Sequence, residues 1–133
     1  MRPTVVCAAA MLLAATTAGA ADWTPGAWVD DETIEILTIG ADEGPHEFPV
    51  WLVVIDDQVY LRLGSRAAER FQKNTTNPYI GVKMAGKDFP KIRVQDAPEM
   101  EQRVAKAMSD KYWSDIFVRY FSHPMTVRLL YEP

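Results

Sequence analysis

The chain has 133 residues, 48% of them hydrophobic and 24% charged, and 18 acidic against 14 basic side chains give a net charge of −4. This length predicts one domain, and such a chain can bury a core without disulfides or metals to hold it together. The acidic balance argues against nucleic acid as the main partner, because binding a phosphate backbone needs a strongly basic surface.

The first twenty residues are predicted to be a secretory signal peptide. Arg2 precedes an apolar stretch from Val5 to Ala15, and small residues at 18–20 suit cleavage. The apolar stretch is shorter than the roughly 20 residues that span a bilayer, which argues against a stable membrane anchor. We therefore expect residues 21–133 to form a single domain that is secreted or periplasmic.

Residues that could bind a metal are scarce in the expected mature chain. Removing residues 1–20 takes away Arg2 and leaves 113 residues, with 13 basic and 18 acidic side chains and a net charge of −5. Cys7 is removed too, so neither a disulfide nor a cysteine-based zinc site is predicted. His46 and His123 are the only histidines; either can titrate near neutral pH or ligate haem iron, but most lone histidines in loops do neither.

The N-terminal part of the mature chain is predicted to be an irregular arm followed by a strand. Trp23 and Trp28 are expected to cover an edge of the core, the alternative being that an indole lies over a ligand ring. Residues 33–40 are rich in β-branched side chains and end at glycine, which predicts the first strand. Residues 42–47, which contain Gly-Pro, are predicted to be a loop.

A β-hairpin is predicted next. Residues 48–55 form an almost unbroken apolar run, Asp56 and Asp57 form the turn, and residues 58–64 form the second strand. Because the first of these strands has no polar face, it should be central and covered on both sides. Pro49 should then lie at its very start, where a missing donor is tolerated.

A short helix follows over residues 65–73, with Ser65 predicted as its N-cap and Arg66 and Arg70 in its first turns. Such a helix start favours an anion, because its exposed N–H groups and dipole act together with the guanidinium groups. The alternative is that the arginines are solvated or paired with neighbouring carboxylates. Asn77-Pro78 ends this unit.

A second hairpin is predicted from residues 79–84 and 89–95, joined by a turn at 85–88. Its second strand alternates, so that Ile92 and Val94 face one way and a positively charged side faces the solvent.

The C-terminal part is predicted to be helical and then extended. Asp96 and Glu99 have the spacing of an acidic capping box at a helix start. Lys111–Phe121 is a second helix or a continuation, His123-Pro124 stops it, and residues 126–131 form the last strand. The predicted buried stripe of the helix consists of Met100, Val104, Ala107, Met108 and Tyr112.

Six strands joined mostly by short turns favour an antiparallel barrel over a doubly wound sheet, because parallel strands need crossover helices. The predicted fold class is therefore α+β, mainly β with helices, and a six-stranded antiparallel barrel.

Three segments of the chain resemble the split-barrel flavin-binding superfamily, the pyridoxamine 5′-phosphate oxidase-like proteins. They are Pro49-Val50-Trp51, the stretch from Leu61 to Ser65 that leads into a helix, and Asn77-Pro78. The nearest branch is that of the deazaflavin-dependent nitroreductases and their small uncharacterised relatives, and the resemblance covers roughly residues 33–95. The glycine-rich stretch that those relatives often carry after the third strand is reduced here to Gly64.

This resemblance implies that FMN or a deazaflavin lies along a split barrel, in a homodimer with its site at the subunit interface. Trp51 and Val53 would line the ring. Arg62, Ser65 and Arg66 would hold the phosphate, with Lys87 on the adjacent hairpin as an addition. The implied activity is that of an oxidoreductase acting on a small organic substrate, with the cofactor carrying the chemistry. The residues themselves suggest no catalytic acid, base or nucleophile.

Two other hypotheses stay open at the level of sequence. One is a cofactor-free binding module that uses the groove around Trp51 for a small apolar ligand or haem. The other is a structural or interaction role, which would be favoured if the N-terminal tryptophans filled that groove.

Overall fold

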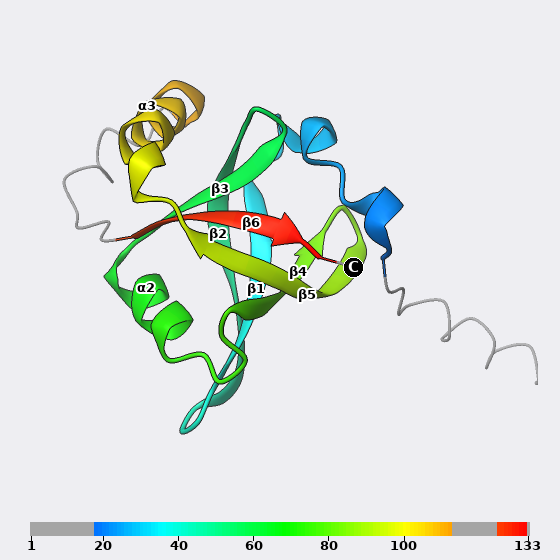
Figure 1. Ribbon diagram of the computed structural model, residues 1–133, viewed down its shortest axis with the longest axis vertical. Coiled ribbons are helices and arrows are strands. Elements are labelled where there is room, and N and C mark those ends of the chain that lie inside the picture. The colour runs from blue at the N-terminus through cyan, green and yellow to red at the C-terminus, as the bar shows by residue number, and fades with distance from the viewer. Residues whose placement is uncertain (1–17, 113–124, 133) are drawn as a thin grey trace, which may run out of the picture.

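The computed structural model describes residues 18–112 and 125–132, in which six strands form a closed antiparallel barrel (Figure 1). The strand order around the barrel is β1-β2-β3-β6-β5-β4. This confirms the predicted α+β class and the six-stranded antiparallel barrel. The strands are β1 (Thr33–Gly40), β2 (Gly44–Ile55), β3 (Gln58–Leu63), β4 (Tyr79–Met84), β5 (Lys87–Asp96) and β6 (Met125–Tyr131). The helices are α2 (Ser65–Gln72) and α3 (Glu101–Lys111), with short 3₁₀ turns η3 (Ala20–Asp22), η4 (Pro25–Trp28) and η5 (Pro98–Met100).

Two tight turns set the register of the predicted hairpins. Asp56 and Asp57, between β2 and β3, both have positive φ, at 52° and 62°. The β4–β5 turn consists of Ala85 and Gly86 alone, with φ of 54° and 75°, because the two residues that follow already pair with β4. Two residues of positive φ match the twist of the flanking strands, so both turns favour hairpins.

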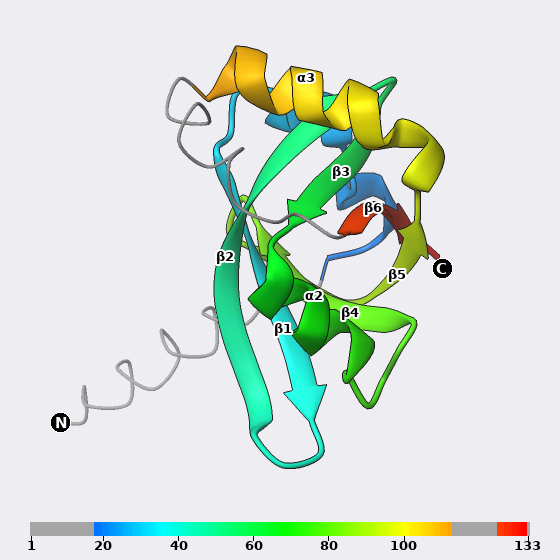
Figure 2. The ribbon, with the colours of Figure 1, turned by 90° about the vertical axis from the view of Figure 1, so that its left-hand side faces the viewer.

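The strand β2 is longer than the sequence predicts. It begins at Gly44 and pairs with β1 along its whole length up to Trp51, so the predicted loop at 42–47 is wrong. Pro49 accordingly lies inside the strand and not at its start, in register with Glu35. The β1–β2 hairpin projects beyond the barrel in Figure 2, with alternate residues of β2 exposed. This strand is covered on both faces only near its C-terminal end.

The barrel interior holds the main core. Trp28 is buried at one end of the barrel, and both Trp28 and Trp23 make edge-to-face contacts with Phe89. The tryptophans therefore cover a core edge, as predicted. The interior side chains, none more than 2% exposed, include Ile34, Ile36, Leu52, Val59, Leu61, Leu63, Ile80, Ile92, Val127 and Leu129.

A second core lies outside the barrel, where α3 crosses β2 and β3. The predicted stripe is confirmed: Val104 and Met108 are buried against Val53 and Tyr60. The predicted capping box is wrong, because Asp96 is still in β5, in register with Val127, and η5 precedes the helix.

Several predictions fall on residues outside the described part of the chain. The helical segment beyond residue 112, its stop at His123-Pro124 and most of the signal peptide lie there. Within the described ranges, no helix has the length and apolar character needed to cross a bilayer.

Candidate functional site

The start of α2 presents backbone N–H groups without a side-chain cap. Gly64 is the N-cap residue, and among the described residues no side chain caps the helix. Ser65 is the first helical residue and is exposed, so its predicted capping role is wrong. The first N–H groups of a helix have no acceptor within the helix, and the dipole there favours negative charge. This helix start can therefore receive an anion.

Trp51 and Arg62 lie on one outer surface next to that helix start. Leu52 and Leu61 are in register and point into the barrel, so the residues beside them face outward. Arg62 is also in register with Thr126 on β6 and precedes Gly64 by two residues. We call the surface of Trp51, Arg62 and Thr126 the outer β2–β3 face. The structure thus places Trp51 and Arg62 on the same outer face, with Arg62 at the end of the strand that leads to Ser65.

Part of the predicted ring site is occupied by the protein's own side chains. Tyr112 stacks on Trp51 with ring centroids 4.3 Å apart and an interplanar angle of 3°. Val53 is 2% exposed beneath α3 and so faces no open space in this structure. Alternation in β2 places Val53 on the same side as Trp51, but it does not reveal that α3 covers that position. The helical stripe predicted Tyr112 as buried without identifying its partner.

The hydroxyl of Tyr112 is held by the backbone of two neighbouring segments. Its hydroxyl is 2.7 Å from the carbonyl oxygens of Leu52 and of Glu32, to which it donates. The neighbouring Lys111 ammonium donates to the carbonyls of Leu52 and Asp31, and its burial lowers the pKa of Lys111. Burial raises the pKa of Tyr112 to about 12.

This pKa predicts a loss of stability in alkali. Because Tyr112 ionises near pH 10 when unfolded but only near 12 when folded, its contribution is complete below pH 10 and is lost as the pH rises from 10 to 12. The loss should approach about 3 kcal/mol. Urea titrations between pH 9 and pH 12 should therefore show a steeper fall of the unfolding free energy in the wild type than in Tyr112→Phe. Parallel curves for the two proteins would contradict the assignment.

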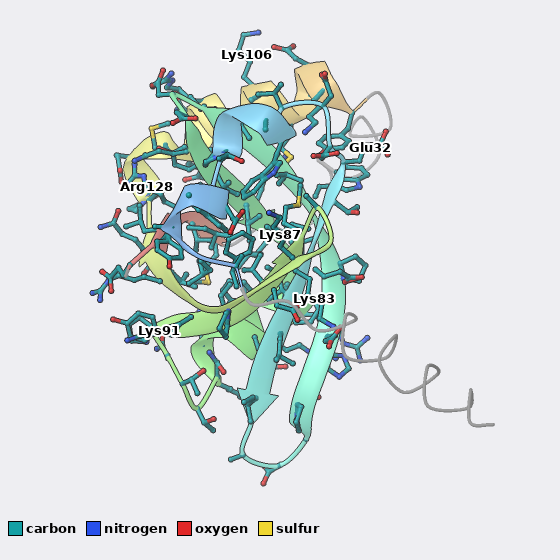
Figure 3. All side chains as sticks on the ribbon, turned by 90° about the vertical axis from the view of Figure 1, so that its right-hand side faces the viewer. Glu32, Lys83, Lys87, Lys91, Lys106 and Arg128 are labelled. Carbon is teal, nitrogen blue, oxygen red and sulfur yellow. The ribbon has the colours of Figure 1, made fainter. Side chains whose placement is uncertain are left out.

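Arg66 and Lys87 do not join the outer β2–β3 face. Arg66 is exposed and lines a cavity of about 520 Å³ between α2 and the β1–β2 hairpin. Lys87 forms an ion pair with Asp22, which is the main cause of a lowered pKa of that carboxyl. In Figure 3, the β4–β5 turn with Lys87 lies beside the N-terminal segment. That view is taken from the side opposite to the view of Figure 2, in which α2 lies in front. The fold therefore separates Lys87 from the start of α2.

The structure describes one of the two histidines, His46. His46 lies in β2 and not in a loop, in register with Thr38 and with its ring 5.9 Å from that of Phe48. His123 lies outside the described residues. Within residues 18–112 and 125–132, no group of three His, Cys, Asp or Glu side chains is placed to bind a metal ion.

A polar cluster that was not predicted from the sequence lies next to Val53. The Arg128 guanidinium donates to the Tyr60 hydroxyl at 2.9 Å and to the Glu99 carboxylate at 3.1 Å. The hydrogen bonds to these partners raise the pKa of Arg128, and the bond to Tyr60 has the largest effect. Finding this cluster from sequence requires knowing that β6 pairs with β3, which places Arg128 opposite Tyr60.

Comparison with known proteins identifies the fold. No family model and no curated protein matches the chain. Among solved structures, the conserved hypothetical protein Rv2991 from Mycobacterium tuberculosis has a TM-score of 0.57 at 18% identity, covering 90% of this chain and 84% of that one. A chain described as a domain-swapped dimer has a TM-score of 0.57 at 14% identity and covers 96% of both chains. An F420-H2 dependent reductase, FDR-A, has a TM-score of 0.53 at 16% identity, covering 76% of this chain and 95% of that one. These similarities show that the chain shares the fold of these proteins, and they confirm the predicted split barrel as its fold.

Proposed function

We propose that this protein binds a phosphate-bearing flavin or deazaflavin at the start of α2 and serves as an exported oxidoreductase for a small organic substrate. The observation that carries the proposal is the uncapped helix start with exposed Ser65, directly after the strand that holds Arg62. The split-barrel fold and the likeness to an F420-H2 dependent reductase support it. The likeness to a domain-swapped dimer supports a homodimer.

The two ends of such a cofactor fit the structure differently. The phosphate end fits, because helix N–H groups, the Ser65 hydroxyl and the Arg62 guanidinium are the donors that phosphate binds. The predicted ring position fits less well, because Val53 is buried and one face of the Trp51 indole is covered by Tyr112. When bound, the ring would supply the redox chemistry. The residues of this chain would bind and orient the cofactor, and we assign no catalytic residue.

FMN and riboflavin differ only in the phosphate, so titrating both ligands tests the phosphate site by fluorescence quenching. The wild type should bind FMN about tenfold or more tightly than riboflavin, because charge-assisted hydrogen bonds contribute about 1.5–3 kcal/mol. Arg62→Ala should lose this preference. Arg103→Ala removes an exposed arginine on α3 that pairs with Asp56, and it should keep the preference. Equal affinities for the two ligands in the wild type would contradict the proposal.

Because Tyr112 covers one face of the Trp51 indole, where the flavin ring was predicted, we keep a second candidate function: a cofactor-free module that binds a small apolar ligand or haem beside Trp51. In that case Trp51→Ala abolishes binding of the ligand or haem, while Arg62→Ala leaves it unchanged. The opposite pattern supports the flavin proposal. A purely structural role was expected to show in N-terminal tryptophans that fill the groove around Trp51. Trp23 and Trp28 instead pack on Phe89, and the ring stacked on Trp51 is that of Tyr112.

A further inference from the structure

The cavity that Arg66 lines has the size of a small-molecule site. Its volume is about 520 Å³, within the roughly 300–1,000 Å³ typical of ligand pockets. Figure 2 shows α2 beside the projecting β1–β2 hairpin, the two elements that form its walls. We call this cavity the hairpin groove. It is lined by Thr38, Gly40, Ala41, Asp42 and Glu43 from β1 and the hairpin turn, and by Arg66, Glu69, Arg70 and Lys73 from α2 and its C-cap.

The wall of the hairpin groove contains an unsatisfied polar atom. Thr38 is 1% exposed, and its Oγ1 is, among the described residues, the one buried side-chain polar atom without a hydrogen-bond partner. The preceding inward-facing residues of β1, Ile34 and Ile36, are apolar. A buried hydroxyl without a partner lowers stability, and valine has nearly the same shape. A ligand in the groove that offers a polar group to this hydroxyl would supply the missing partner.

The charges of the groove leave one cation and one anion uncommitted. Arg70 pairs with Glu43 at 3.3 Å, and Lys73 pairs with Glu69 at 3.4 Å. Within the described part of the chain, the side chains of Arg66 and Asp42 form no ion pair or hydrogen bond. The lining therefore carries three positive and three negative side chains, with one of each sign available to a ligand.

We propose that the hairpin groove binds a small zwitterion of the amino-acid type. Its carboxylate binds the Arg66 guanidinium, which offers paired N–H donors, and its ammonium group binds the Asp42 carboxylate. A further polar group of the ligand bonds to the Thr38 hydroxyl. A simple anion would face three carboxylates in the groove, and a simple cation would face three positive side chains, so a ligand with both charges matches the lining best.

Isothermal titration with glycine, serine, acetate and methylammonium tests the charge requirement. We expect at least one of the two amino acids to bind with a dissociation constant below about 10 mM, and acetate and methylammonium to bind at least tenfold more weakly. Arg66→Gln and Asp42→Asn should each weaken amino-acid binding about tenfold or more. Absence of amino-acid binding, or equal binding of acetate or methylammonium, would overturn the proposal.

Thr38→Val tests the role of the hydroxyl. The variant should melt about 4 °C higher, because the unsatisfied hydroxyl is gone, and should bind the amino acid about tenfold more weakly. Thr33→Val, an exposed position on the same strand, serves as the matched control and should change neither quantity. A Thr38→Val protein that binds as tightly as the wild type would contradict the proposal. FMN binding should be the same in both variants, so this test is independent of the flavin proposal.

Discussion

Replacing Phe89 by alanine is expected to lower the free energy of unfolding by about 3–5 kcal/mol, the range for large aromatic residues in cores. Phe89 is 1% exposed, and its ring centroid lies 5.0 Å from that of Trp23 and 6.1 Å from that of Trp28. Its removal leaves a cavity and detaches the N-terminal arm from the barrel end. Urea denaturation followed by tryptophan fluorescence measures the loss, because two of the indoles contact this ring.

A matched control is Phe48→Ala. Phe48 is half-buried on the projecting β1–β2 hairpin, with its ring 6.4 Å from that of Phe71, so its loss should cost about half as much. If Phe89→Ala cost no more than Phe48→Ala, the arm would not close the barrel as the structure shows.

Replacing Ser65 by aspartate is expected to weaken FMN binding about 100-fold while slightly stabilising the protein. A carboxylate at the first helical residue interacts favourably with the helix dipole, by about 0.3–1 kcal/mol. The same carboxylate repels a phosphate at the helix start by up to about 4 kcal/mol per charge pair near a protein surface. FMN titration and urea denaturation of the same preparation measure the two effects, and their opposite signs exclude unfolding as the cause of lost binding.

Gln102→Asp is the matched control for this charge. It adds one carboxylate to an exposed position in the first turn of α3. This carboxylate should interact with the dipole of α3 about as favourably as the new carboxylate of Ser65→Asp does with that of α2, and it should leave the FMN affinity unchanged. Equal FMN affinity in Ser65→Asp and the wild type would show that the phosphate does not bind at this helix start.

Local residue patterns predicted the strands correctly where the composition of a segment agrees with its pairing in the barrel. The β-branched residues of 33–40 gave the bounds of β1 correctly, and the strand at 79–84 was predicted with the same ends as β4. The start of β2 was missed because Gly44-Pro45 has the composition of a loop, whereas pairing with β1 continues to Gly40 and Gly44. Likewise, the acidic residue at 96 remains in β5 because β6 pairs with it, and no local signal records that pairing.

The candidate site could be predicted only in part, because a sequence does not show which elements meet across the barrel. The resemblance to split-barrel proteins pointed to Trp51 and Arg62, but their place on an outer surface follows only from the strand pairing in the structure. The burial of Val53 and the stack of Tyr112 depend on where α3 lies, and the separation of Lys87 depends on the side to which the β4–β5 turn projects. The hairpin groove depends on the unexpected length of β2.

The most direct test of the account is the absorption spectrum of the protein purified from its native compartment, repeated after adding FMN, a deazaflavin and haem in turn. We expect a flavin or deazaflavin band, present at purification or shifted on addition, that Arg62→Ala fails to show. A colourless protein whose presence changes the spectrum of none of the three ligands would contradict the proposal that this split barrel binds a flavin-type cofactor.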